Sequence, residues 1–168
     1  FRRVHFRSRV AASPAVVHAL IDDFHQWDQW SPWAKLDPAM QKTYSGAPAG
    51  PGAVYEWKGN GKVGQGRMEI IASEPGRRVS LQLDFIKPFA ARNSTEFRLE
   101  QACADCLVTW EMEGPQAFPA RVMGIFVNMD RMIGGQFEEG LANLARVANV
   151  TTAASAAAAA PQGASAAK

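Results

Sequence analysis

The hydrophobic periodicity of the chain changes at Gly114-Pro115, and this change constrains the fold more than any other feature. Beyond this point, apolar residues recur every three or four positions, so they occupy one helix face within about 120° of arc. A helix with one long apolar face needs a second apolar surface against which to bury it. The stripe consists of Val122, Phe126, Met129, Ile133, Phe137, Leu141 and Leu144.

The second surface is predicted in the preceding region, from about Ala39 to Gly114, where apolar and polar residues alternate. Alternation with a period of two is typical of a strand with one buried face. The clearest such run is 79–85, and a further strand is predicted over residues 3–10. Short turns between consecutive runs indicate an antiparallel meander with one apolar face.

Two short helices are predicted between the first strand and the meander. Ser13-Pro14 favours a helix start, because serine is a good N-cap and proline suits the first turn. A second helical piece holds Trp27 and Trp30 and ends at Ser31-Pro32. The order of elements predicts an α+β fold in which a curved antiparallel sheet wraps around the long C-terminal helix.

Length and composition predict one domain over residues 1–150 of the 168, followed by an alanine-rich tail over residues 151–168. The tail lacks large apolar residues and is expected to be disordered. Because alanine favours helix, a frayed extension of the preceding helix is the alternative.

The charge of the chain is balanced, with 18 basic and 16 acidic residues, so no nucleic-acid partner is predicted. Arg2, Arg3, Arg7 and Arg9 cluster near the start but alternate with apolar residues, as on the outer face of a strand. No apolar run reaches the length of a membrane span. Since the chain starts at Phe1, membrane contact through a removed N-terminal anchor stays open, and localisation is either cytoplasmic or membrane-tethered.

Several segments of the chain resemble one known family, the bacterial polyketide cyclase/dehydratase-like branch of the START-like (SRPBCC) superfamily, which also contains birch-pollen-allergen-type proteins. The resemblance covers about residues 3–148. The segments that carry it are FHQWDQWSPW at 24–33 with Asp37-Pro38, GPGAVYEW at 50–57, VGQGRMEI at 63–70, MDRMIG at 129–134 and FEEGL at 137–141.

The resemblance implies a helix-grip fold with a cavity between the long helix and the sheet. Members bind lipids, sterols, polyketides or other apolar ligands, and a few catalyse cyclisation or dehydration. The resemblance implies no shared catalytic motif and no cofactor. It favours a binding or carrier protein for a lipid-like or polyketide-like molecule. A cyclase, aromatase or dehydratase, and an interaction module like the chaperone-activating members, are the alternatives.

The candidate ligand-binding residues are large apolar side chains on the predicted inward faces, together with one carboxylate. Such side chains fill protein cores by default but also line most small-molecule pockets, so both interpretations stay open. The candidates are Trp27, Trp30, Tyr55, Trp57, Met68, Phe85, Phe97, Trp110, Met112, Phe126, Met129 and Asp130.

Asp130 lies on the apolar flank of the predicted helix, where a carboxylate is costly unless it is paired. It either pairs with a sheet arginine such as Arg67 or Arg92, or it serves as a polar anchor or acid in the cavity. Arg67 and Tyr55 are further candidate polar anchors.

Two short motifs match functional strings but are interpreted as turns. Residues 59–64 match GxGxxG, yet a strand pattern follows instead of the helix that a nucleotide site requires, so a tight hairpin turn at Asn60-Gly61 is predicted. Residues 103–106 match CxxC but lie between two strands, which predicts a hairpin tip, with a disulfide as the alternative.

The histidines His5, His18 and His25 all lie in the first 25 residues, outside the predicted cavity strands and the long helix. His18 is off the apolar stripe of its helix and is predicted to be solvated. No spacing indicates a metal site or a catalytic triad, so no metal ligand and no catalytic residue is predicted. This favours a binding protein over an enzyme.

Overall fold

The computed structural model describes residues 2–61, 63–87, 90–114 and 123–159; the side chains of Arg2, Val4 and residues 123–133 are outside this description. The α+β helix-grip fold expected from the sequence is confirmed: a curved antiparallel sheet, a long C-terminal helix and short helices near the N-terminus.

The chain enters the sheet as strand β1 (Arg2–Val10) and then forms helix α1 (Pro14–Ile21). The helix begins where the sequence predicts, because the Ser13 hydroxyl accepts a hydrogen bond from the Val16 amide at 3.4 Å and proline occupies the first turn. Its inner side buries three apolar residues: Val17, Leu20 and Ile21.

Two further short segments connect α1 to the meander. The 3-10 helix η1 (Phe24–Gln29) is capped by Asp23, whose carboxylate accepts from the His25 amide at 2.9 Å. Helix α2 (Trp33–Leu36) follows Pro32. The sequence pattern did not predict it as a separate helix. With Trp30, which directly follows η1, they contain the tryptophans that precede the meander.

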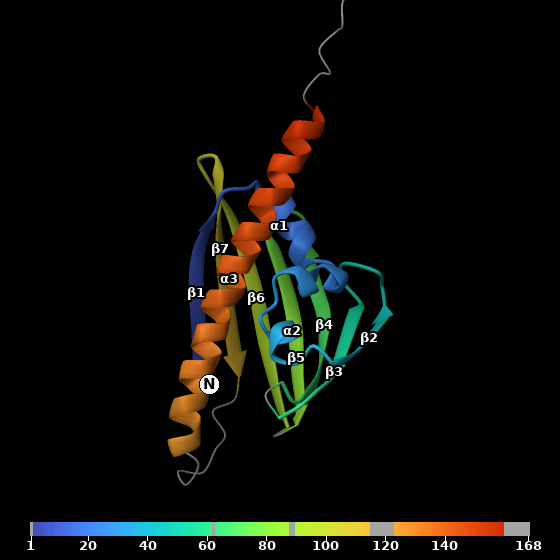
Figure 1. Cartoon of the computed structure of the whole chain (residues 1–168), viewed down its shortest axis with the longest axis vertical. Helices are drawn as coiled ribbons and strands as arrows, with labels where there is room; N and C mark the ends of the chain where they lie inside the picture. Colours follow the sequence, from blue (N-terminus) through green and yellow to red (C-terminus); the bar gives the residue numbers. More distant parts are fainter. Residues whose placement is uncertain (1, 62, 88–89, 115–122, 160–168) are drawn as a thin grey trace, which may run out of the picture.

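In the described part of the chain the sheet has seven strands in the order β1-β7-β6-β5-β4-β3-β2, and every neighbouring pair is antiparallel (Figure 1). Short connections place consecutive strands side by side, while β1 pairs with the last strand of the meander. The strand bounds are β2 (Gln41–Gly46), β3 (Ala53–Lys58), β4 (Gln65–Glu74), β5 (Arg78–Lys87), β6 (Ala91–Ala102) and β7 (Asp105–Gly114).

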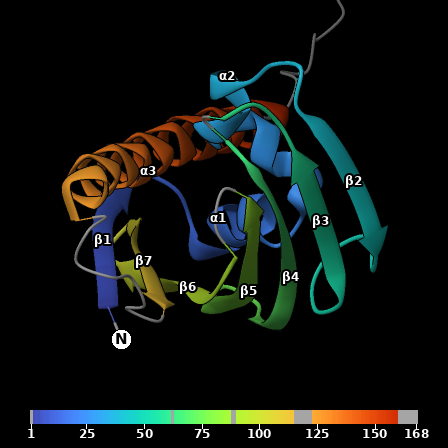
Figure 2. The ribbon, with the colours of Figure 1, turned by 90° about the horizontal axis from the view of Figure 1, so that it is seen from below.

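Helix α3 (Met123–Ala159) lies along the open side of the bent sheet, as Figure 2 shows. It contacts β1, α1 and η1. Two register irregularities on β4, at Gln65/Gly66 and at Ile70/Ala72, fit the bend, because bulges increase local twist. The helix continues through residues 151–159, the extension that the sequence left open as an alternative.

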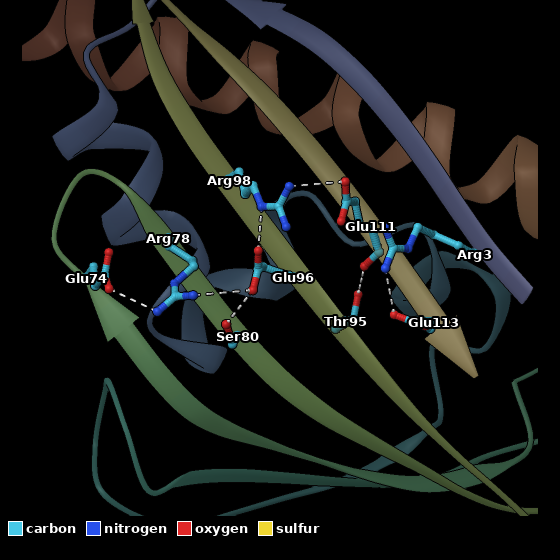
Figure 3. A network of polar contacts seen from close by, with 9 residues as sticks. All are labelled: Arg3, Glu74, Arg78, Ser80, Thr95, Glu96, Arg98, Glu111 and Glu113. Carbon is cyan, nitrogen blue, oxygen red and sulfur yellow. Dashed lines mark hydrogen bonds and ion pairs between the residues drawn. The ribbon is translucent and has the colours of Figure 1, made fainter. Parts of the chain in front are cut away.

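The outer face of the sheet carries charged residues that pair across neighbouring strands (Figure 3). Arg98 lies 2.6 Å from Glu96 and 3.5 Å from Glu111, and similar pairs continue along the sheet. Each such exposed pair contributes about 0–1 kcal/mol. This outer face is charged and in contact with solvent, so apolar surface is concentrated on the inner face. The further pairs are Arg3–Glu113, Arg9–Asp105, Arg67–Glu69, Arg78–Glu74, Arg78–Glu96 and Arg92–Asp84.

The connection over residues 59–64 is longer than the predicted tight turn. Strand β3 ends at Lys58 and β4 begins at Gln65, and the amide of Gly59 donates to the Gly64 carbonyl at 2.8 Å. Gly64 has the positive φ, 66°, whereas Gly61 does not. The prediction of a two-residue turn at Asn60-Gly61 is therefore wrong. The prediction that a strand, not a helix, follows the glycines is confirmed.

Candidate functional site

The inner face of the sheet divides into a closely packed part and a half-buried part. The packed part is an aromatic cluster of Trp30, Phe97, Trp110 and Phe137, each no more than 3 % exposed. Ring centroids lie 4.6 Å apart for Phe97–Trp110 and 4.2 Å apart for Trp110–Phe137. At these distances the rings are in direct contact. We call these four residues the aromatic cluster.

The indole groups beside and within the cluster have hydrogen-bond acceptors inside the protein. Trp30 Nε1 donates to the Leu20 carbonyl at 3.0 Å, and Trp110 Nε1 donates to the Thr95 hydroxyl at 3.0 Å. The neighbouring Trp27 donates to the backbone in the same way, 2.9 Å from the Ile21 carbonyl. A buried indole with a satisfied N–H needs no further partner. These tryptophans are held as core side chains.

The half-buried part lies at the end of the sheet where β3, β5 and β7 finish. Trp57, Phe85 and Met112 point to the inner face, yet each is only partly buried. Trp57 and Phe85 meet edge to face with centroids 6.1 Å apart, and Trp57 Nε1 donates to the Val63 carbonyl at 2.9 Å. We call these three residues the half-buried wall. Figure 1 places the N-terminal half of α3 at this same end of the sheet.

Small residues separate the side chains of the half-buried wall. Gly66 is the register partner of both Trp57 and Phe85, and Ala91 is the partner of Phe85. The strand β7 ends nearby in Gly114. The Trp57 ring lies over Gly66, and Asn93 occupies the space beside Gly114, so these glycines allow large side chains to lie close to the sheet.

Asn93 is a polar residue on this inner face that the sequence interpretation missed. It is paired in register with the buried Leu83, its Nδ2 lies 3.8 Å from Met112 Sδ, and it packs where a side chain at Gly114 would stand. The contact to sulfur is weak, so the amide keeps hydrogen-bonding capacity. Extending the alternation of strand β6 backwards from Phe97 to position 93 would have placed it inside.

Tyr55 lies on the inner face of β3, between Trp57 and Tyr44. Burial, first, and then the neighbouring phenol and the Asp28 carboxylate raise its pKa above the ordinary tyrosine value. Burial, followed by the carboxylates of Asp28 and Asp23, also raises the pKa of Tyr44. Tyr55 therefore stays protonated at neutral pH, where it can donate a hydrogen bond but does not act as a phenolate base.

The raised tyrosine pKa values predict weaker stability in alkali. Both tyrosines of the chain, Tyr44 and Tyr55, have a folded-state pKa above the ordinary tyrosine value of about 10, so the folded protein binds their protons more tightly than the unfolded chain does. Their contribution to stability is fully present below pH 10 and is lost as the pH rises through the folded-state pKa.

This expectation is checked by absorbance at 295 nm. Phenolate formation in the folded protein should begin above the pH at which free tyrosine ionises, and it should shift back to that pH in 8 M urea (a concentration on the order used for full unfolding). A phenol that titrates in the folded protein like free tyrosine contradicts the burial described above.

The structure places nine of the twelve predicted site residues, in three groups. Trp27, Trp30, Phe97 and Trp110 lie in the packed core; Tyr55 and Met68 are buried on the inner face, each 9 % exposed. Trp57, Phe85 and Met112 form the half-buried wall. The side chains of Phe126, Met129 and Asp130 lie outside the described residues, and their roles stay predictions.

The arginines proposed as partners of Asp130 do not face α3. Arg67 lies 2.7 Å from Glu69 and Arg92 lies 2.8 Å from Asp84, in both cases on the outer face of the sheet. The alternation of β4 and β6 turns them away from the helix. The prediction that Arg67 orients a ligand in the interior is therefore wrong. The predicted pairing of Asp130 with Arg67 or Arg92 involves a side chain outside the described residues.

His18 is also placed differently from the prediction. It is 9 % exposed, and its Nε2 lies 2.9 Å from the Ser73 hydroxyl on β4. Helix α1 packs against the sheet on a broader side than its apolar stripe suggests, so a residue beside the stripe is covered. The prediction of a solvated His18 is wrong, and the imidazole instead connects α1 to the sheet.

Two of the hollows that described residues line do not include the half-buried wall. One, of about 170 Å³, lies between η1 and the β2–β3 hairpin and is lined by Phe24, His25, Tyr44, Ser45, Gly46, Ala47, Pro48, Ala53 and Val54. The other, of about 290 Å³, lies between β1 and α3 and is lined by Phe6, Arg7, Ser8, Glu138, Leu141 and Ala142.

The CxxC pair lies at the tip of the β6–β7 hairpin, as predicted, and both thiols are free. Cys103 is exposed with φ 58°, whereas Cys106 is buried, and burial raises the pKa of its thiol. Among the described residues there is no group of three or more metal-ligating side chains. No helix in the described part of the chain is long and apolar enough to cross a membrane.

A curved antiparallel sheet that wraps a long C-terminal helix, with short helices after the first strand, defines a helix-grip protein. Within this class, residues 2–149 match the family described as "Polyketide cyclase / dehydrase and lipid transport". The chain belongs to that family, and the resemblance seen in its sequence is confirmed. No curated protein matches the chain significantly.

Solved structures with this fold share little sequence with the chain. Protein CV1439 from Chromobacterium violaceum is 15% identical over 87% of this chain and 96% of its own, with a TM-score of 0.60. CalU16 from Micromonospora echinospora is 17% identical over 86% and 72%, with a TM-score of 0.58. Ara h 8.0201 is 16% identical over 85% and 97%, with a TM-score of 0.56. At such identities the similarity shows the fold alone.

Proposed function

We propose that the protein binds an apolar small molecule, lipid-like or polyketide-like, between the half-buried wall and the N-terminal half of α3. One observation carries this proposal. Trp57, Phe85 and Met112 point to the inner face of the sheet but stay only partly buried, next to Gly66 and Ala91. Large apolar side chains that the protein leaves incompletely covered gain most from a ligand that covers them.

The composition of the wall indicates the chemistry of the ligand. Burial of apolar area contributes about 25 cal/mol per Å², so an apolar skeleton supplies the affinity. Edge-to-face indole and phenyl rings and a polarisable thioether accept planar and branched skeletons alike. Asn93 adds one amide, which suits a single carbonyl or hydroxyl group on an otherwise apolar ligand.

The wall supports a carrier better than a cyclase or dehydratase. Proton removal next to a carbonyl needs a side chain that accepts a proton near neutral pH. Trp57, Phe85, Met112 and Asn93 provide none, and the raised pKa of Tyr55 keeps its phenol protonated. Among the described residues, the half-buried wall and Asn93 provide the apolar surface and the polar group that binding needs.

The proposal is tested with Nile red, a neutral apolar dye whose fluorescence rises in apolar surroundings. Phe85→Ala removes one side of the wall and is expected to weaken dye binding about tenfold, since a buried phenylalanine side chain contributes about 1.5–3 kcal/mol. Ile86→Ala is the matched control, because Ile86 follows directly on β5, is 50% exposed and points away from the inner face. It is expected to leave dye binding unchanged.

Equal dye affinity of the Phe85→Ala and Ile86→Ala proteins would place the apolar site elsewhere and contradict the proposal. Mass spectrometry under native conditions provides an independent readout. The wild-type protein mixed with a medium-chain fatty alcohol should show a one-to-one complex that Phe85→Ala loses and Ile86→Ala keeps. Absence of the complex from all three proteins counts against the proposal as well.

A further inference from the structure

The hollow between η1 and the β2–β3 hairpin is separate from the proposed ligand site and contains a histidine held in one orientation. His25 lines it, with its ring stacked on Tyr44 at a centroid distance of 4.3 Å and an interplanar angle of 19°. His25 Nδ1 also lies 2.7 Å from the Asp23 carboxylate. Stacking and hydrogen bond together set the plane and the rotation of the imidazole.

The second contact of Asp23 is not required for capping. One oxygen, Oδ1, already accepts from the backbone amide of His25 at 2.9 Å, as an N-cap residue does. Its hydrogen bond with Nδ1 fixes the tautomer instead: a carboxylate only accepts, so Nδ1 donates, and Nε2 carries the lone pair of the neutral ring. No partner of Nε2 is found among the described residues.

The surroundings of His25 select the kind of molecule that can use this acceptor. Phe24, Ala47, Pro48 and Val54 provide apolar walls. The hollow is open to solvent, and its volume of about 170 Å³ is enough for a single ring, given that a water molecule occupies about 30 Å³ in the liquid.

Charge near the hollow disfavours an anion. The Asp23 carboxylate contacts the imidazole directly, whereas the Asp28 carboxylate is already paired with Lys42 Nζ at 2.6 Å. An anionic group at Nε2 would face the negative charge of Asp23 across the ring without a cation of its own. A full positive charge, in turn, is costly against the apolar walls. The group that suits His25 Nε2 is therefore a neutral hydrogen-bond donor.

We infer that this hollow is a second binding site, which takes a single planar ring carrying a neutral hydroxyl group. The hydroxyl donates to His25 Nε2 while the ring packs against Phe24, Pro48 and Val54. Asp23 and Tyr44 act as positioning residues that hold the imidazole. The inference does not depend on the proposed function, because the hollow contains none of the residues of the half-buried wall.

The test compares phenol with toluene, which has the same ring and nearly the same size but no donor. Binding is followed by amide shifts in ¹H–¹⁵N correlation spectra of the labelled full chain. Phenol should shift the amides of Tyr44, Gly46, Ala47 and Val54 with a millimolar dissociation constant and bind about fivefold more tightly than toluene, as one net hydrogen bond allows. Benzoate should bind more weakly than phenol.

His25→Phe is the informative variant, because a phenyl ring retains the stacking on Tyr44 but offers no acceptor. It should bind phenol and toluene equally. His5→Phe is the matched control: His5 is exposed on β1, far from the hollow in the sheet order, and this variant should keep the fivefold preference. Phe85→Ala should keep it too, which separates this site from the proposed function.

Three results would overturn the inference. They are equal binding of phenol and toluene by the wild-type protein, a preference for phenol that persists in His25→Phe, and shifts centred on Phe85 and Met112 instead of the hollow. A dispersed spectrum of His25→Phe establishes that the variant is folded, so a loss of preference can be assigned to the missing acceptor.

Discussion

Trp110→Ala is expected to lower the free energy of unfolding by about 3–5 kcal/mol, the usual cost of removing a large aromatic side chain from a packed core. Trp110 is 3% exposed and contacts Phe97, Phe137 and Trp30 with ring centroids 4.6, 4.2 and 5.9 Å away. The variant also removes the donor to Thr95. The cavity that the indole leaves would lie between the sheet and α3, where the neighbouring rings are themselves packed, so few of them can move into it.

Urea unfolding followed by far-ultraviolet circular dichroism measures this effect. Ile71→Ala is the control, because Ile71 is 54% exposed and its truncation should cost less than about 0.5 kcal/mol. Where Trp110→Ala does not fold, Trp110→Phe retains a ring and should lose about 1–2 kcal/mol, mainly through the unmade hydrogen bond and the smaller ring. A stability of either Trp110 variant equal to that of Ile71→Ala would mean that the aromatic cluster is a pocket wall.

Gly66→Ala is expected to cost about 1–3 kcal/mol through overpacking, although it adds only one methyl group. A Cβ atom at this position would overlap the Trp57 ring and would lie 2.8 Å from the Asp84 carbonyl oxygen. The carbonyl belongs to the backbone of β5 and cannot turn away. Trp57 can move only if it gives up its hydrogen bond to Val63. The substitution should therefore also weaken Nile red binding.

Gly61→Ala is the matched control within the same β3–β4 connection. Nothing lies within 4 Å of a Cβ atom at Gly61, and its φ is not in the left-handed region. The added methyl group should be neutral or stabilise slightly, by restricting the unfolded chain. Thermal unfolding of both variants and dye titration provide the comparison. Equal unfolding temperatures of the two variants would show that Trp57 is not packed against Gly66.

The sequence and the structure agree best where burial follows the backbone period. The run 79–85 alternates strictly, and β5 buries Val79, Leu81 and Leu83 on one face, as expected. The start of α1 was also predictable, because an N-cap and a first-turn proline act within a few residues. In both cases the determining interactions are local.

The sequence-based predictions fail where the position of a side chain depends on a residue from a distant part of the chain. His18 is buried because it packs against Ser73, which lies 55 residues away in the sequence. The stacking of His25 on Tyr44 likewise needs β2 beside η1, which no spacing in the sequence indicates.

The sequence by itself determined the order of the elements, the α+β class and the membership in the polyketide cyclase and lipid transport family, because periodicity and motifs are properties of neighbouring residues. Only the tertiary structure separated the packed aromatic cluster from the half-buried wall. Tryptophans at equivalent inward positions, such as Trp110 and Trp57, have the same pattern in the chain. Their burial differs because it depends on which helix, strand or glycine stands opposite in space.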